Sequence, residues 1–484
     1  MRKNKFIAIV MAAALSTTLF TACSGASSSS ADSSASSDSP SAQSSSMGAP
    51  PSSSAPSGAP GDSAPSGAPG GAPGGGPGGS SADVTYTGAT EVTSADTQDG
   101  KTYSSTTADE SALIVNTSDA VTVSNATITK TGDSDGGDSC NFYGLNAALL
   151  AMGGTTTTIT GATITSDADG ANGVFSYGGN GGRNGAAGDG TTVVISDSNI
   201  TTTGDGSGGI MTTGGGVTYA NDLTVETSGR SSAAIRTDRG GGTVVVDGGS
   251  YTSNGLGSPA IYSTADITVS NATLTSNLSE GVCIEGMNSI TLENCDMTAN
   301  NTQMNGNATF LDTIMIYQSM SGDADSGTSA FTMTGGSLTS LNGHMFHVTN
   351  THAVITLSGV ELVNEDDGNV LLSVCDDGWS GAGNIAELNA VGQVLSGTIL
   401  VGDDSSLTLN LTEGASFEGA ISGAIENAKG DTVSTEVGEV TVTLDATSTW
   451  TLTADTSITA FEGDVENINA NGYTLFVNGE ALVG

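Results

Sequence analysis

ADITVSNATLTSN, at residues 265–277, contains one complete copy of the repeating unit from which the fold can be predicted. Its apolar residues Ile267 and Val269 alternate with polar ones, which is the two-residue period of a strand with one buried face. Asn271 follows, and asparagine is one of the few residue types that tolerate a left-handed backbone. A second short alternating run begins near Leu274. The unit is therefore predicted to be strand, left-handed corner, strand.

The same unit recurs along most of the chain. Its further copies are VTVSNATIT (121–129), TTITGATIT (157–165), VVISDSNIT (193–201), VTYANDLTVE (217–226), VVVDGGSYT (244–252), ITLENCDMT (290–298), FTMTGGSLT (331–339) and ITLSGVELV (355–363). The predicted corner is always Asn, Asp or Gly: Asn125, Gly161, Asp197, Asn221, Gly248, Asn271, Asn294, Gly335 and Gly359. Because ordinary strand positions are not so restricted, we expect a positive φ at each of these residues.

The spacing between copies predicts how they stack. Tyr219, Val246, Val269 and Leu292 follow one another at roughly two dozen residues, a period typical of solenoids. A second repeated phrase fills the remainder of each period, at 206–216, 231–241, 257–266 and 279–288, and predicts a third strand that begins at Ile210, Ile235, Ile261 and Val282. Three strands per turn, each paired with its copy one turn on, make an all-β parallel β-helix.

In these repeats the sequence resembles the right-handed parallel β-helix superfamily, which includes pectate-lyase-like enzymes, polysaccharide-binding proteins and bacterial surface adhesins. The resemblance covers about residues 83–480. It implies a solenoid over residues 83–439, and capping coils over residues 440–484 that close the stack with Trp450, Phe461, Tyr473 and Phe476. It implies no single activity, because one fold hosts many functions.

The first 82 residues predict export and anchoring. Residues 1–22 have a basic start and an apolar run too short to span a membrane comfortably, which is typical of a signal peptide. The run ends in LFTAC and resembles a bacterial lipobox, which implies lipidation of Cys23. An ordinary signal cleaved near Ala22 is the alternative. Residues 23–82 are rich in Ser, Ala, Gly and Pro, and such a segment is expected to be a disordered tether.

Charge and cysteine content limit the partners. The net charge is −41 with only ten Lys and Arg, so nucleic acid is excluded as a partner, because phosphate binding needs clustered cations. The acidity suits solubility or divalent cations, which leaves Ca²⁺ open as a ligand, and no organic cofactor is implied. Cys295 is expected to point inward and Cys283 outward, and no obligatory disulfide or zinc site is predicted.

The third strands predict a surface for ligand binding. If the residues Leu113, Leu149, Val174, Ile210, Ile235, Ile261, Val282, Ile314 and Phe346 point inward, their successors point outward. Two outer columns then collect large side chains, and from them we select as ligand-binding candidates Phe175, Tyr177, Arg236, Asp238, Tyr262, Glu285 and Tyr317. Aromatic rings beside a few charged groups suit a sugar polymer. The alternative is that the insertions at 178–192 and 299–330 fold over this face and bury it.

Catalysis is a second hypothesis, drawn from the fold alone. A lyase needs a base beside an acidic sugar and a cation that neutralises the carboxylate, and Arg236, Arg239 and Asp238 are the candidates. A glycoside hydrolase needs two carboxylates at a suitable separation, and Asp238 with Glu285 is the candidate pair. No motif surrounds these residues, so an enzyme is less favoured than a binding protein.

The sequence thus predicts a monomeric lipoprotein on the outer side of a bacterial cell membrane, held there by its lipid alone. Its expected partner is a polysaccharide or another cell-surface or host ligand, and adhesion is the related role. A polysaccharide lyase or glycoside hydrolase is the first alternative. A purely structural spacer of the envelope is the second.

Overall fold

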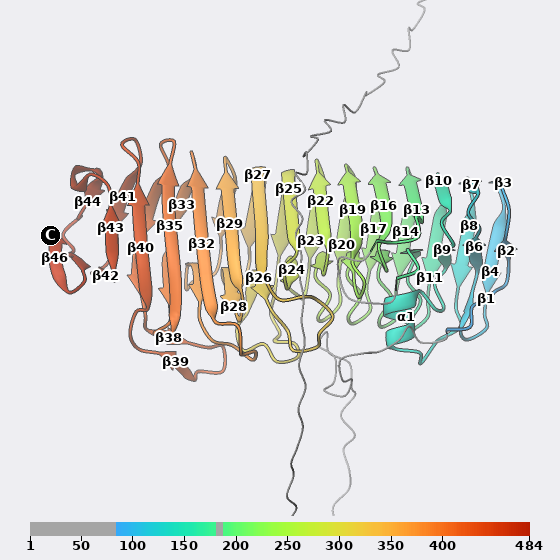
Figure 1. Cartoon of the computed structure of the whole chain (residues 1–484), viewed down its shortest axis with the longest axis horizontal. Helices are drawn as coiled ribbons and strands as arrows, with labels where there is room; N and C mark the ends of the chain where they lie inside the picture. Colours follow the sequence, from blue (N-terminus) through green and yellow to red (C-terminus); the bar gives the residue numbers. More distant parts are fainter. Residues whose placement is uncertain (1–83, 181–186) are drawn as a thin grey trace, which may run out of the picture. The chain divides into compact units, whose positions relative to one another are not determined.

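The computed structural model describes residues 84–180 and 187–484, and these form a long stack of β-strands (Figure 1). The predicted signal peptide and tether, the lipidation candidate Cys23 and residues 181–186 of the insertion at 178–192 lie outside the described residues. The strands follow one another in chain order along the stack, and each coil of the chain contributes three of them. The all-β parallel β-helix predicted from the repeats is confirmed.

In each coil, the strand before the corner belongs to the first face and the strand after the corner belongs to the second face. These two faces together form one 22-stranded sheet. Its strands are β3 (Asp96–Asp99), β4 (Thr102–Ser105), β7 (Ala120–Ser124), β8 (Thr127–Lys130), β10 (Thr156–Thr160), β11 (Thr163–Ser166), β13 (Thr192–Ser196), β14 (Asn199–Thr202), β16 (Gly216–Asn221), β17 (Thr224–Thr227), β19 (Gly242–Asp247), β20 (Ser250–Ser253), β22 (Asp266–Ser270), β23 (Thr273–Ser276), β25 (Ser289–Ala299), β27 (Thr328–Ser340), β29 (His352–Ser358), β30 (Glu361–Asn364), β32 (Asn384–Val391), β35 (Ser405–Thr412), β40 (Glu439–Leu444) and β43 (Ala460–Glu462).

The third strand of each coil belongs to a 13-stranded sheet, the third face. Its strands are β2 (Glu91–Val92), β6 (Leu113–Asn116), β9 (Leu149–Met152), β12 (Val174–Tyr177), β15 (Ile210–Thr213), β18 (Ile235–Thr237), β21 (Ile261–Ser263), β24 (Val282–Glu285), β26 (Asp312–Tyr317), β28 (His344–Thr349), β31 (Val370–Val374), β34 (Thr398–Val401) and β37 (Ile421–Ser422). The predicted inward ladder from Leu113 to Phe346 is in register across these strands and is buried, as expected.

Smaller elements complete the chain. Near the C-terminus the second face continues as β33 (Val394–Ser396), β36 (Ser416–Gly419), β41 (Thr449–Leu452) and β44 (Ile468–Asn469), and a last sheet contains β42 (Thr456–Ile458), β45 (Leu475–Val477) and β46 (Glu480–Val483). The remaining elements are β1 (Thr87–Gly88), β5 (Glu110–Ser111), β38 (Ile425–Glu426), β39 (Thr432–Ser434), the helix α1 (Asp138–Tyr143) and the 3₁₀ turn η1 (Val465–Asn467).

The corners between the first and second faces have the predicted left-handed backbone. φ is positive at Asn125, Gly161, Asp197, Gly248, Asn271, Asn294, Gly335 and Gly359. Neighbouring corners are also linked through side chains, since Asn271 Nδ2 donates to Asp247 Oδ1 at 2.7 Å. The Asn, Asp or Gly at each corner therefore sets the direction in which the chain turns.

The prediction for Asn221 is wrong by one residue. The positive φ falls on Asp222, because β16 has one residue more before its corner than the simple repeat assumes. A shift of one residue moves side chains to the other side of a strand. Thr218 is accordingly buried, and Tyr219, which pairs with Val245 and not Val246, is 43% exposed.

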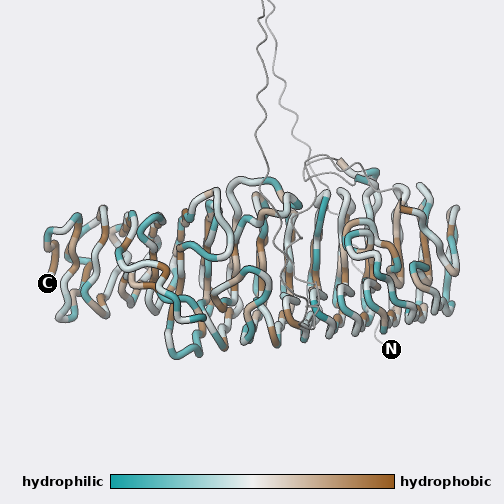
Figure 2. Tube along the Cα trace, turned by 90° about the horizontal axis from the view of Figure 1, so that it is seen from below, coloured by the Kyte–Doolittle hydropathy of each residue, from teal (hydrophilic) through white to brown (hydrophobic). Residues whose placement is uncertain are grey.

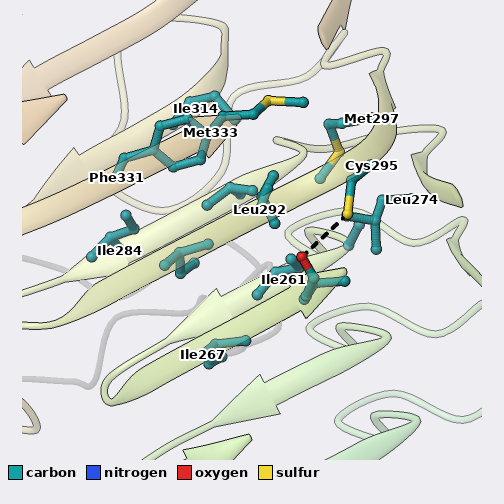
Figure 3. Close-up of a cluster of buried hydrophobic side chains, with 14 of the residues drawn as sticks. Ile261, Ile267, Leu274, Ile284, Leu292, Cys295, Met297, Ile314, Phe331 and Met333 are labelled. Carbon is teal, nitrogen blue, oxygen red and sulfur yellow. Dashed lines mark hydrogen bonds between the residues drawn. The ribbon is translucent and has the colours of Figure 1, made fainter. Parts of the chain in front are cut away.

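The interior of the coils is filled by aliphatic and sulfur-containing side chains. Figure 3 shows Leu292, Cys295 and Met297 of β25 among the side chains that fill the interior of the stack. Cys295 is fully buried, as predicted, and its thiol donates to the carbonyl of Val269 at 3.3 Å. Along the chain, hydrophobic and hydrophilic residues alternate around each coil (Figure 2). The described cysteines, Cys140, Cys283, Cys295 and Cys375, are all free thiols.

Serine hydroxyls link successive coils at the start of the third face. Ser207 Oγ accepts from the backbone N–H of Ala171 at 2.8 Å, and Ser232 Oγ accepts from Ser207 N–H at 2.9 Å. Ser258 Oγ accepts from Ser232 N–H at 2.8 Å. Because each hydroxyl satisfies a buried amide of the coil before it, this serine ladder replaces backbone pairing where the strands are interrupted.

The C-terminal coils bury only part of the predicted cap. Trp450 is fully buried and stacks on Phe417, with ring centroids 5.8 Å apart. Phe461 is half-buried, whereas Tyr473 is 38% exposed. The final strand β46 runs antiparallel to β45, so the direction of the chain reverses at the end of the stack.

We predict that the corner asparagines are selected for their backbone conformation. Asn271→Val should lower the free energy of unfolding by about 1–2 kcal/mol, because a β-branched residue is strained at φ 56°. Asn271→Gly should cost less. Urea denaturation measures both, with Thr275→Val on the outer side of β23 as a control that should remain near wild type. Equal losses for Val and Gly at position 271 would contradict the prediction.

Candidate functional site

The side chains predicted to form an exposed ligand face are buried. Phe175 is 0% exposed, Tyr177 is 6%, Tyr262 is 9% and Tyr317 is 4%. Their outward direction from the third face is as predicted, because they follow the inward ladder in register. The expectation that they face solvent is wrong, since other segments of the chain lie over them. We call this outer side of the third face the covered face.

One part of the cover was foreseen and two were not. The insertion at 299–330 packs Ala308 against Tyr262 and Tyr317, as the alternative interpretation held for this insertion. The other insertion of that interpretation, at 178–192, lies partly outside the described residues. The short helix α1 covers the N-terminal part, where Phe142 and Tyr143 pack on Phe175 and its neighbours. Trp379 follows β31 and lies 4.9 Å from Tyr317, measured between ring centroids.

Arg236 and Asp238 form a buried ion pair on β18 and just beyond it. Arg236 Nη2 lies 2.6 Å from Asp238 Oδ2, and the exposed fractions of the two residues are 9% and 3%. The guanidinium also donates to Asn141 Oδ1 at 3.3 Å and stacks on the Tyr262 ring. Burial raises the pKa of Asp238 to about 6, although Arg236 acts in the opposite direction.

Arg239 holds the 299–330 insertion against α1. Its Nη2 lies 2.6 Å from Asp323 Oδ1, and its guanidinium lies 4.2 Å from the centroid of the Phe142 ring. This pair is more exposed than the Arg236–Asp238 pair. Arg239 therefore connects two segments of the cover that are far apart in sequence.

Glu285 is enclosed by hydroxyl groups. Tyr262 and Tyr317 donate to Oε2 at 2.5 and 3.2 Å, and Ser319 and Ser321 donate to Oε1. Burial raises the pKa of Glu285, and the hydrogen bonds from Ser319 and Tyr262 offset part of this rise. Each of the two carboxylate oxygens accepts two hydrogen bonds, so the hydrogen-bonding capacity of Glu285 is satisfied within the protein.

A buried Ser–His–Asp contact was not found by the sequence analysis. His347 Nδ1 lies 2.7 Å from Ser373 Oγ, and His347 Nε2 lies 3.4 Å from Asp377 Oδ2. His344 Nδ1 also contacts Ser373 Oγ at 2.7 Å. Burial and the adjacent His347 lower the pKa of His344 to about 3. Only the register between β28 and β31 brings these residues together, and no local sequence motif marks it.

These contacts do not suit the catalytic roles considered from the sequence. Arg236, Asp238, Arg239 and Glu285 are each engaged by other side chains beneath the cover. Asp238 and Glu285 are separated by two coils, about 10 Å, and Tyr262 lies on the coil between them. His347 and Ser373 are both 0% exposed. As they stand in the fold, these groups hold the cover to the third face.

An open groove lies beside the covered face, where the third-face strands turn into the first face. Its volume is about 450 Å³. It is lined by Ala187, Gly188, Gly215, Gly240, Gly241, Gly242, Thr243, Ala265, Asp266, Met287, Asn288 and Asp325. Apart from Asp325, these residues come from consecutive coils, so the groove runs along the stack over four intervals, or about 19 Å.

The glycines of the groove are required by close packing between coils. A Cβ at Gly188 would lie 2.2 Å from the carbonyl oxygen of Gly215, and one at Gly242 would lie 2.7 Å from that of Gly216. Gly188, Gly215 and Gly242 are partly exposed, so backbone groups contribute to the floor at these positions. Met287 is 53% exposed, and Asp266 contributes an exposed carboxylate. The groove thus combines peptide groups, an apolar side chain and acceptor oxygens.

Comparison with known proteins adds no relative. The chain matches no protein-family model, and searches of curated proteins and of solved structures found no similar protein. In the described part of the chain, no helix has the length and apolar character that a membrane span needs. The strand pairing itself identifies the fold, and the groove and the covered face are the features that bear on function.

We predict that Arg236 is needed mainly to neutralise Asp238. Arg236→Met should lower the free energy of unfolding by about 3–5 kcal/mol near neutral pH, because it leaves a buried carboxylate without its partner. The loss should shrink below about pH 5. A pKa raised by folding means that the folded state binds the proton more tightly, so stability is retained at low pH and lost as pH rises.

Denaturant unfolding at about pH 4.5 and pH 7.5 measures this difference. Arg239→Met is the matched control: its partner Asp323 is partly exposed, so the loss should be about 1 kcal/mol and nearly independent of pH. A pH-independent loss for Arg236→Met would contradict the role assigned to Arg236.

Proposed function

We propose that this chain is a bacterial surface lipoprotein whose parallel β-helix binds an extended, uncharged polysaccharide in the groove beside the covered face. The single observation that supports the ligand class is the groove itself, which continues over consecutive coils and has the shape that an extended chain requires. The pattern of residues 1–23 supports the lipid anchor, and the composition of residues 24–82 supports a tether between membrane and body.

Charge selects among polysaccharides. The lining includes Asp266 and Asp325, and the chain as a whole carries a net charge of −41. An acidic glycan would be repelled by this field, whereas neutral sugars can donate hydroxyl hydrogens to carboxylate and peptide oxygens. This choice departs from pectate-lyase-like chemistry, in which an acidic sugar is the substrate.

The covered face supports the binding role indirectly. Its buried ion pair, its hydroxyl-enclosed carboxylate and its aromatic contacts fix the strands that carry the groove. Sites built on rigid elements hold ligand contacts more precisely than sites on loops. A groove with a fixed glycine floor and no aromatic ring among its lining residues suits modest affinity along a polymer, as adhesion requires.

We predict that filling the groove abolishes binding. Thr243 lines it and is exposed on β19, so Thr243→Trp places a bulky side chain there at a position that tolerates aromatic residues. Retardation in gels containing β-glucan, mannan or polygalacturonate measures binding. The wild type should bind a neutral polymer and ignore polygalacturonate, and the variant should bind at least about tenfold more weakly.

Thr408→Trp is the matched control, since Thr408 occupies the same outward ladder several coils away from the groove. It should bind as the wild type does. Equal binding by the Thr243 variant would place the ligand elsewhere. Formation of unsaturated products from polygalacturonate, followed by ultraviolet absorbance, would support the lyase alternative.

A further inference from the structure

Two carboxylates are stacked on neighbouring coils of the third face, beneath the segments that cover it. Glu280 stands just before β24, and Asp312 is the first residue of β26. β24 and β26 pair with Val282 opposite Ile314, and Gly281 N–H donates to the carbonyl of Thr313 at 2.8 Å. Counting back along this register places Glu280 opposite Asp312, at the interstrand separation of about 4.8 Å.

Both carboxylates are buried, and no described cation compensates them. Glu280 is 7% exposed and Asp312 is 1% exposed. Within residues 84–180 and 187–484, no Lys, Arg or His forms an ion pair with either of them. Ser279 Oγ donates to Glu280 Oε2, whereas Asp312 Oδ1 has no hydrogen-bond partner among the described atoms. Buried charges of like sign in direct register are costly unless a bound cation or a proton neutralises them.

A third oxygen at the same place also lacks a partner. Asn301 is 1% exposed, and its Nδ2 donates to the backbone carbonyl of Asp312 at 3.1 Å. Its Oδ1 is buried without a hydrogen bond among the described atoms. The Asn301 amide is close enough to Glu280 to lower the pKa of that carboxyl, although burial raises it overall. Burial is also the main cause that raises the pKa of Asp312. The nearby negative charges of Glu280 and Asp377 raise it further.

We infer that Glu280, Asp312 and Asn301 form a binding site for a hard divalent cation, Ca²⁺ or Mg²⁺, between two coils of the third face. The proposed donors are carboxylate and amide oxygens, which these cations prefer. Cys283 lines the hollow beside Glu280, and His344 lies opposite Asp312 on the next coil, with its Nδ1 in contact with Ser373 Oγ. A charge of +2 balances the two carboxylates. Beside Glu280 a hollow of about 20 Å³ has room for about one water molecule, which can add a further oxygen ligand on the side of Glu280.

This inference is independent of the polysaccharide proposal, because the site lies under the cover and not in the groove. The competing explanation is a proton shared by the two carboxyls, which needs no metal. The two explanations differ in what stabilises the fold. A bound cation makes stability depend on Ca²⁺ or Mg²⁺ concentration, whereas a shared proton makes it depend on pH alone.

Thermal unfolding of the full chain tests the site. After treatment with a chelator, about 1 mM Ca²⁺ or Mg²⁺ should raise the unfolding temperature by about 3 °C or more relative to NaCl of equal ionic strength. Asp312→Asn and Glu280→Gln should lose this gain. In chelator both variants should unfold at or above the wild-type temperature, because the like-charge repulsion is relieved.

Glu418→Gln is the control for general screening of the acidic surface, since Glu418 is exposed on β36. It should keep the full cation-dependent gain. Two outcomes would overturn the site: no gain for the wild type over NaCl, or an unchanged gain in both Asp312→Asn and Glu280→Gln. If the wild type ignores both cations and Asp312→Asn reduces the dependence of stability on pH, a shared proton explains the two buried carboxyls instead.

Terbium luminescence gives a second readout at the same position. The chain has two tryptophans, and Trp379 lines the hollow with Glu280, whereas Trp450 stacks on Phe417 in the C-terminal coils. Tb³⁺ emission excited through tryptophan should appear in the wild type and be competed by Ca²⁺. It should be lost in Asp312→Asn. Trp379→Phe should reduce the emission but keep the Ca²⁺-dependent rise in unfolding temperature. Full emission in the Asp312 variant would contradict the assignment.

Discussion

The left-handed corner between the first and second faces determines how each coil of the chain is placed on the one before it. It turns the chain after a fixed number of strand residues, and every coil then places equivalent side chains above one another. Asn, Asp and Gly are the residue types for which this conformation is least costly. Once the corners align, the inward ladders form the core, and the outward ladders of the third face carry the groups that bind the cover.

Much of the fold could be predicted because the repeat is local and has a two-residue period. The inward ladder from Leu113 to Phe346 and all but one of the corners follow from alternation and residue type alone. The error at Asn221 arose where an extra strand residue before Asp222 disturbed the period, which a pattern with fixed spacing does not detect. The helix α1 was missed because six residues give too few turns for an apolar period to show.

The candidate site could be predicted less well, for a different physical reason. The sequence correctly placed Phe175, Tyr262 and Tyr317 on the outward side, but direction does not determine exposure. Exposure depends on segments distant in sequence, such as Trp379 and the ion pair of Arg239 with Asp323 across 84 residues. The groove has the same origin: its floor is backbone, and glycines that appear as simple turns in the sequence become a lining only after stacking.

The serine ladder has a consequence for how such a chain changes over time. Ser207, Ser232 and Ser258 each supply the acceptor for the coil before, so every middle coil offers and receives the same bond. Excision or tandem duplication of one whole repeat leaves each amide with an equivalent acceptor, whereas a gain or loss of one residue misplaces the following side chains. The length of the β-helix can thus change by whole repeats during evolution, and the length of surface available to an extended partner changes with it.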